Sequence, residues 1–191
     1  GVDENIVNMT YKEVRRLDAG SWYSDEYKGE KVPGLREVLE LAQGKIKLNI
    51  ELKPADNGEE LARKTVALIE KYNMENDCVI TSFSSSALSA AKSCDENIRV
   101  GYILSAAYGD YYDMKNIDFF SVNAAFLSKR TIDAIHNSGK QVYAWTVNNK
   151  DSIKNLTNKG VDGVITDNPV LARETIYSRD TSETIVNMIR Y

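Results

Sequence analysis

The sequence has few of the side chains on which disulfide scaffolds, zinc sites and histidine-based catalysis depend. Its 191 residues include two cysteines, Cys78 and Cys94, and one histidine, His136. Two cysteines in a chain of this length form neither a disulfide framework nor a zinc-binding pattern, so we expect two free, partly buried thiols. A single histidine also excludes a two-histidine acid–base pair built from this chain alone.

Long apolar runs and an excess of positive charge are also missing. No apolar run approaches the roughly 20 residues that a membrane-spanning helix needs, and no signal peptide is visible, so a membrane partner is not implied and the location stays open. The formal net charge is −4 without a basic cluster, which argues against a nucleic-acid partner. The composition, 42% hydrophobic and 27% charged, is typical of a globular protein, and the length suits one domain over residues 1–191.

Strand-like and helix-like segments alternate along the chain after residue 45. The strand-like segments are 46–52, 79–83, 98–104, 119–123, 142–147 and 163–166. The helix-like segments are 59–72, 85–93, 128–138, 151–158 and 169–177. Before them, the sequence predicts a short helix, a loop with aromatic and charged residues, and a helix over 35–42. The alternation predicts an α/β protein with a parallel sheet and right-handed crossovers.

Two arrangements of such a sheet are compatible with this pattern. One is an open doubly wound sheet, and the other is a partial (β/α)8 TIM barrel with six of its eight parallel strands present. A nucleotide-binding open sheet favours a glycine-rich first turn, and none of these turns has one. The barrel also accounts better for a first strand with one polar face, because one face of each barrel strand points inward.

That first strand lies in the stretch "KIKLNIELK", residues 45–53. Apolar residues occupy its even positions, and its odd positions are polar and end in Glu51 and Lys53. The alternation predicts a strand, but its polar face has two interpretations. The pair is either a solvated edge or a carboxylate and an ammonium directed into a site at the carboxyl end of the strand.

Five motifs in order, "LDAGSWYSDEYKGEKVPGLREVLE", "LNIELK", "VITSFS", "AWTVN" and "GVDGVITDNP", resemble those of the glycerophosphodiester phosphodiesterases. Each motif is weak alone, and the ordered set is specific. The resemblance extends to about residue 177 and implies a (β/α)8 barrel. It also implies a small-molecule substrate and metal-dependent hydrolysis of glycerophosphodiesters to glycerol 3-phosphate and an alcohol.

The chain also departs from that family's pattern. A His-Arg-Gly motif, a Glu-x-Asp pair and a His-Asp pair are absent, and with them the family's catalytic histidines and two of its metal ligands. We therefore expect a truncated barrel that is inactive on its own. Its two open sheet edges, in "KIKLNIELK" and "GVDGVIT", predict self-association.

The resemblance assigns roles to four residues. By this resemblance, Glu51 is a ligand of a divalent cation, Mg²⁺ or Ca²⁺, both of which prefer oxygen donors. Lys53, on the same strand face, is a phosphate-binding residue, and Trp145 and Phe83 form walls of the substrate pocket. The structural alternatives are a solvated strand edge for the charged pair and core packing for the two aromatic side chains.

Two further residues receive structural interpretations. We expect Asp167 to cap the helix that begins near Pro169, and His136 to lie on an outer surface helix. Two other functions stay open. One is a non-catalytic barrel that binds a phosphorylated ligand or a protein, and the other is a lipid phosphodiesterase of the phospholipase type. The leaving-group alcohol is not determined by this sequence.

Overall fold

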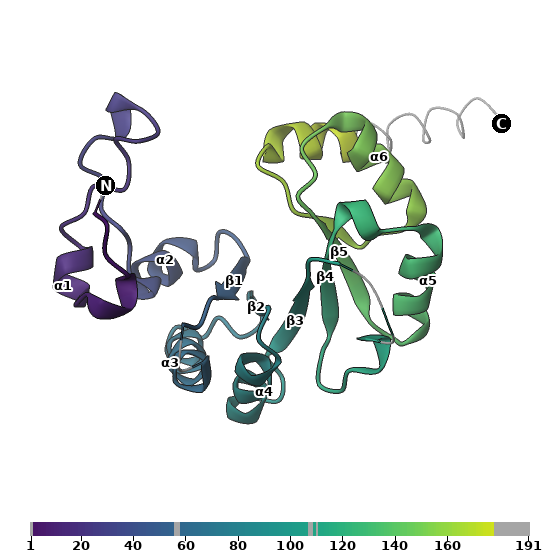
Figure 1. Cartoon of the computed structure of the whole chain (residues 1–191), viewed down its shortest axis with the longest axis horizontal. Helices are drawn as coiled ribbons and strands as arrows, with labels where there is room; N and C mark the ends of the chain where they lie inside the picture. The colour runs from purple at the N-terminus through teal and green to yellow at the C-terminus, as the bar shows by residue number, and fades with distance from the viewer. Residues whose placement is uncertain (1, 56–57, 107–108, 110, 178–191) are drawn as a thin grey trace.

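The computed structural model describes residues 2–55, 58–106, 109 and 111–177, and its centre is a six-stranded sheet (Figure 1). Every paired strand runs parallel to its neighbour, and the spatial order β1-β2-β3-β4-β5-β6 follows the chain. The strands are β1 Leu48–Leu52, β2 Cys78–Ser82, β3 Arg99–Leu104, β4 Phe119–Asn123, β5 Gln141–Trp145 and β6 Gly163–Val164. In a doubly wound sheet the spatial order of the strands reverses at one point, and this sheet has no such reversal. The partial barrel is therefore confirmed and the open alternative is wrong.

Helices connect the strands and cover the outer face of the curled sheet (Figure 1). The α-helices are α1 Tyr11–Val14, α2 Leu35–Ala42, α3 Gly58–Lys71, α4 Ser85–Cys94, α5 Lys129–Asn137 and α6 Lys150–Lys159. Short 3₁₀ helices lie at η1 Ile6–Asn8, η2 Asp25–Tyr27, η3 Tyr111–Asp113 and η4 Ala124–Phe126, and residues 169–177 are also helical. Within the described residues, no helix combines the length and apolar character needed to cross a bilayer.

The hydrophobic core fills the space between the sheet and these helices. Leu52, at the end of β1, is buried there with helix residues such as Val66 and Ile69 of α3 and Leu88 of α4. The apolar even positions of β1 thus face the helices, as the alternation of its sequence predicts. The odd positions are left on the concave side of the sheet.

The predicted elements agree closely with the structure. All six strands are present, and the helix predicted over 35–42 is α2 itself. No strand end differs from its prediction by more than two residues. β1 begins two residues later than predicted, and β5 and β6 each end two residues earlier. For β1 and β6 the reason is that an edge strand pairs on one side only, so fewer ladder hydrogen bonds define its ends.

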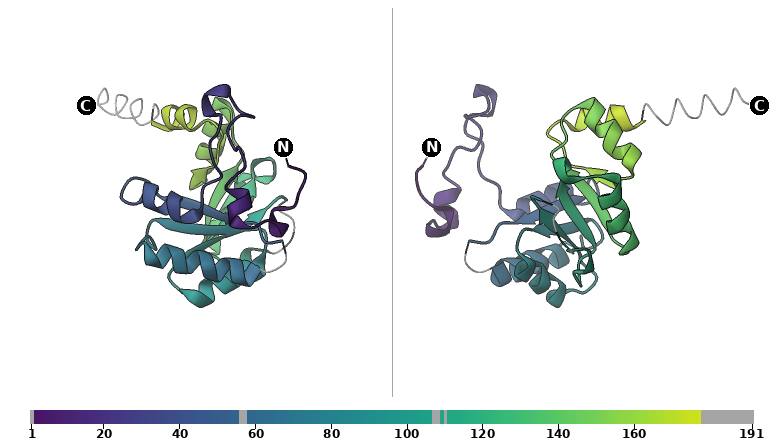
Figure 2. Two further views of the ribbon diagram at one scale, coloured as in Figure 1. Left: turned by 90° about the vertical axis from the view of Figure 1, so that its left-hand side faces the viewer. Right: turned by 45° about the vertical axis from the view of Figure 1, so that its right-hand side comes forward.

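Residues before α2 form an arm that stands away from the sheet (Figure 2). Its loop is organised by the carboxylate of Asp18, which accepts backbone hydrogen bonds from Gly20, Ser21 and Gly29, each 2.9 Å long. These bonds, with that from the Ser21 hydroxyl, hold the pKa of Asp18 well below its usual value. The loop presents Trp22 with 82% of its surface exposed.

Candidate active site

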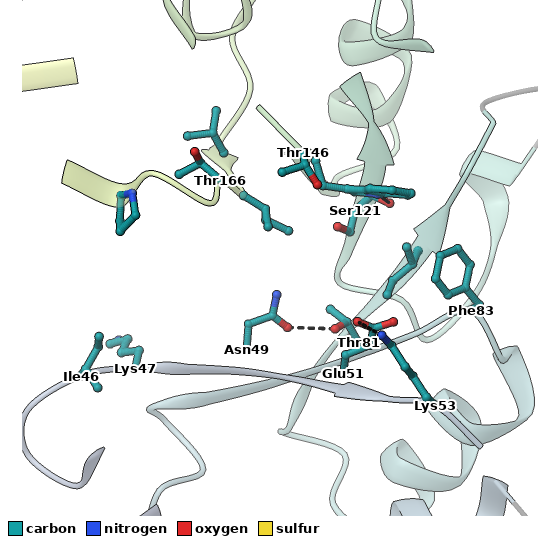
Figure 3. Close-up of a pocket in the computed structure, with 15 residues that line it drawn as sticks. Ile46, Lys47, Asn49, Glu51, Lys53, Thr81, Phe83, Ser121, Thr146 and Thr166 are labelled. Carbon is teal, nitrogen blue, oxygen red and sulfur yellow. Dashed lines mark hydrogen bonds and ion pairs between the residues drawn. The ribbon is translucent and has the colours of Figure 1, made fainter. Parts of the chain in front are cut away.

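The concave face of the sheet opens into a pocket of about 850 Å³ (Figure 3). Its polar lining comes mainly from the inward-facing positions of the strands and from the turns that follow their carboxyl ends. This is the end at which parallel α/β barrels carry their chemistry. Its lining includes Asn49, Glu51, Lys53, Thr81, Phe83 and Trp145.

Glu51 and Lys53 both line this pocket, so the polar face of β1 points inward rather than to an outer edge. Lys53 Nζ lies 3.5 Å from Glu51 Oε2 (Figure 3). The lysine side chain is 77% exposed and that of the glutamate 34%. An exposed ion pair of this kind contributes little to stability, about 0–1 kcal/mol, so either group can exchange its partner for a ligand at small cost.

Trp145 and Phe83 form an aromatic wall on the same pocket. Their ring centroids lie 6.3 Å apart with an interplanar angle of 88°, an edge-to-face contact. Trp145 Nε1 donates to the backbone carbonyl of Ser121 over 3.0 Å, which fixes the indole against β4. Phe83 follows β2 directly and is 48% exposed, so it is not a core aromatic residue.

A buried serine joins the two strand ends that carry these groups. Ser82 is fully buried, and its hydroxyl donates to the carbonyl of Leu52 over 2.8 Å. The same oxygen accepts from the backbone N–H of Ser84 over 3.0 Å. These two bonds tie the end of β1, next to Glu51 and Lys53, to the turn that carries Phe83.

Asn49 and Thr81 also belong to the site, although no sequence motif pointed to them. The Thr81 hydroxyl donates to Asn49 Oδ1 over 2.9 Å, and Thr81 lies opposite Glu51 in the parallel register. The alternation of β1 was sufficient to find Asn49, which is two residues before Glu51 on the same face. Thr81 required the strand register, which the sequence does not specify.

His136 lies in α5, on the outer layer, as predicted. Its Nε2 is 2.9 Å from Oδ2 of Asp162, which also accepts from the backbone N–H of Val142. Val142 is near the amino end of β5, whereas Trp145 and the pocket are at its carboxyl end. The histidine is therefore at the opposite end of the sheet from the pocket.

Two smaller predictions were wrong. Asn168, not Asp167, caps the last described helix, because Asn168 immediately precedes Pro169 and its Oδ1 accepts from the backbone N–H of Leu171 over 3.1 Å. Asp167 instead accepts from the side-chain amide of Asn148 over 2.7 Å. Both cysteines are free, as predicted, but neither is partly buried, because Cys78 lies in the core and Cys94 is exposed at the end of α4.

The lining of the pocket offers an incomplete set of cation ligands. Glu51 is the one carboxylate among the lining residues, and the ammonium of Lys53 stands beside it. Across the part of the chain that the structure describes, no group of three or more His, Cys, Asp or Glu side chains could hold a metal ion. Mg²⁺ is commonly held by one or two carboxylates together with waters and phosphate oxygens, so within this lining Glu51 can supply one of the donors that such a cation needs.

Comparison with known proteins gives one consistent family. Residues 1–171 match the Glycerophosphoryl diester phosphodiesterase family. A glycerophosphodiester phosphodiesterase of Caldanaerobacter subterraneus subsp. tengcongensis is 26% identical over 195 residues, which cover 97% of this chain and 73% of that protein.

Solved structures agree with the sequence match. The chain resembles a phosphodiesterase of Oleispira antarctica in complex with its product sn-glycerol-3-phosphate, with a TM-score of 0.80 and 29% identity over 92% of this chain and 73% of that one. A glycerophosphodiester phosphodiesterase of Parabacteroides distasonis has a TM-score of 0.79 at 22% identity, covering 90% of this chain and 72% of that one, and supports the fold.

Proposed function

Because this chain belongs to the glycerophosphoryl diester phosphodiesterase family, we propose that its pocket binds glycerophosphodiesters as part of a metal-dependent phosphoric diester hydrolase. The reaction breaks one phosphorus–oxygen ester bond and releases glycerol 3-phosphate and an alcohol. The observation that carries the proposal is the adjacent Glu51 and Lys53 on the inner face of β1, beside an aromatic wall. Support for the ligand class comes from the Oleispira antarctica phosphodiesterase, whose bound product is sn-glycerol-3-phosphate.

Lys53 is the phosphate-binding residue in this proposal. Its ammonium carries three donors on a long, mobile and mostly exposed side chain. It can leave Glu51 and contact a phosphoryl oxygen, where negative charge increases as the ester bond breaks. The lysine therefore contributes both to binding and to the rate.

Glu51 is one carboxylate ligand of a divalent cation, Mg²⁺ or Ca²⁺, in this proposal. Such a cation polarises a phosphoryl oxygen when it is bound. The other lining residues do not complete its coordination, so we assign Glu51 this single role and derive no catalytic step from the cation. Glu51 also holds the Lys53 ammonium within 3.5 Å when no phosphate is present.

Phe83 and Trp145 form the apolar wall of the substrate pocket. Their edge-to-face contact leaves ring surface towards the pocket, and the indole N–H is already bonded to a backbone carbonyl. The two rings therefore offer carbon surface rather than polar groups. That surface suits the carbon atoms of a glycerol or alcohol group, while Lys53 takes the charged end.

Residues 1–191 alone bind the ligand but turn it over poorly or not at all, in this proposal. The one histidine of the chain lies at the amino end of the strands and is bonded to Asp162. The described pocket holds no imidazole to move protons. A non-catalytic module that binds a phosphorylated ligand is the second candidate, and this observation favours it.

Titration with glycerol 3-phosphate and an assay with a glycerophosphodiester test the proposal. Trp145 lines the pocket, so its fluorescence reports binding. Lys53→Met should weaken binding, whereas Lys71→Met, an exposed lysine at the end of α3, should not. Equal affinity of wild type and Lys53→Met would refute the assignment of Lys53, and robust metal-dependent hydrolysis by residues 1–191 would refute the proposed inactivity.

A further inference from the structure

The side-chain amide of Asn49 has a fixed orientation in the pocket. Its Oδ1 accepts the hydroxyl hydrogen bond of Thr81 over 2.9 Å. The amide nitrogen then points away from Thr81 and into the open centre of the pocket (Figure 3). Among the described residues, no hydrogen bond is made by this Nδ2, so the pocket contains an unused donor group.

Thr81 is well placed to impose that orientation. It lies on β2, next to β1, with 2% of its surface exposed. A threonine hydroxyl could accept or donate, but its bond to the amide oxygen leaves the amide nitrogen free for a ligand. The residue therefore acts on the ligand through Asn49 and not by direct contact.

We propose that Asn49 is a ligand-binding residue whose Nδ2 donates to an oxygen atom of the bound glycerol phosphate, and that Thr81 is its positioning residue. The inference rests on the proposed function and extends it to a specific donor. Asn49 is two residues before Glu51 on the same face of β1, so it lies about 6.6 Å further from the carboxyl end of the strand. Its Nδ2 can therefore reach ligand oxygens that lie between the Glu51–Lys53 pair and the floor of the pocket.

Neighbouring groups suit an acceptor atom rather than a cation at this position. The charged side chains that line the pocket are Lys47, Glu51 and Lys53. Lys47 Nζ lies 4.0 Å from Asp77 Oδ1 and donates to the carbonyl of Asn76, so Lys53 is the cation that a ligand bound beside Asn49 can recruit. The amide donor of Asn49 adds a directional hydrogen bond to that charge. A phosphoryl oxygen and a glycerol hydroxyl both provide the required lone pair.

The experiment compares Asn49→Ala, Asn49→Asp, Thr81→Val and Thr81→Ser in the whole chain, titrated with glycerol 3-phosphate and with inorganic phosphate. Asn49→Ala should weaken glycerol 3-phosphate binding roughly 2- to 10-fold, the range for one hydrogen bond. Asn49→Asp keeps the acceptor for Thr81 but replaces the donor with an anionic oxygen, so it should weaken binding further. Thr81→Val should reduce affinity, and Thr81→Ser, which keeps the hydroxyl, should restore it.

Thr65→Val is the matched control, because Thr65 is equally well buried and donates to a backbone carbonyl inside α3. It should bind like wild type. A second measurement needs no variant: the side-chain amide resonances of Asn49 in wild type should shift as glycerol 3-phosphate is added.

Loss of phosphate affinity in Asn49→Ala would identify a phosphoryl oxygen as the acceptor, and loss with glycerol 3-phosphate alone would identify a glycerol hydroxyl. Either result supports the inference. Wild-type affinity in Asn49→Ala, with Lys53→Met weakened, would overturn this inference and leave the proposed function intact. Absence of binding by the wild-type chain would overturn both.

Discussion

Leu52 gives the sharpest test of the two faces of β1, because it lies between Glu51 and Lys53 and points the other way. It is 3% exposed and belongs to the core between the sheet and the helices. Leu52→Ala removes buried carbon atoms from that core without touching the pocket lining. We therefore expect a loss of stability without a loss of glycerol 3-phosphate affinity.

The size of the effect follows from burial. Replacing a fully buried leucine with alanine costs about 2–5 kcal/mol, because transfer free energy is lost and a cavity remains. With a urea dependence of about 2 kcal/mol per molar, the midpoint of unfolding should fall by roughly 1–2.5 M. The same loss should lower the melting temperature by several degrees, at about 2–4 °C per kcal/mol for a chain of this size.

Urea unfolding followed by circular dichroism gives the stability, and ligand titration of the folded variant gives the affinity. Leu41→Ala is the matched control, because Leu41 is 70% exposed in α2 and the same truncation there should change stability by less than about 0.5 kcal/mol. If Leu52→Ala retained wild-type stability but weakened ligand binding, the assignment of the two faces of β1 would be refuted.

Three other predictions concern the cation, acid pH and assembly. Glu51→Gln keeps the shape of the side chain but loses its anion. Because Glu51 is one donor among several, the cation is titrated with glycerol 3-phosphate present, whose oxygens supply further donors, and the cation affinity of Glu51→Gln should then fall at least tenfold while the unfolding midpoint stays within error. Equal cation affinity of the two proteins by calorimetry would contradict the ligand assignment. Hydrogen bonds, first from Ser21, lower the pKa of Asp18, so the stability that its carboxylate gives to the loop of the arm should be complete above about pH 4 and decline below it. The fluorescence of Trp22 should change over this acid range in wild type and should not change in Asp18→Asn. In the part of the chain described, β1 and β6 each have an unpaired outer edge, so the chain should self-associate more as its concentration rises. A constant monomer mass by light scattering would count against this prediction.

The sequence was sufficient for the features that depend on local periodicity. The alternation over 48–53 determines which side chains of β1 face the helices, and the structure confirms it for Leu52 and Glu51. The strand–helix alternation likewise predicted the six parallel strands. These features could be read directly because each depends on residues a few positions apart.

Features that depend on register or on single-residue choices could not be read in this way. The bond from Thr81 to Asn49 joins residues 32 positions apart and exists only because β1 and β2 pair in one register. Asp167 and Asn168 are both good capping residues, and only the position of the helix start selects Asn168. Ser82 was missed for a related reason, since its two hydrogen bonds form only when the strand ends meet.

The strictly sequential order of the strands has a consequence for how the chain folds and opens. The most extensive contacts between elements join units that are close along the chain, such as α3 with α4, β1 with β2 and β4 with β5. Folding can then begin in one βα unit and spread by addition of adjacent units, with small loop-closure costs at each step. Opening should proceed in the reverse direction, from β1 and β6 towards β3 and β4. Amide hydrogen exchange should therefore be slowest in the two middle strands and faster towards both edges, including the edge that carries Glu51.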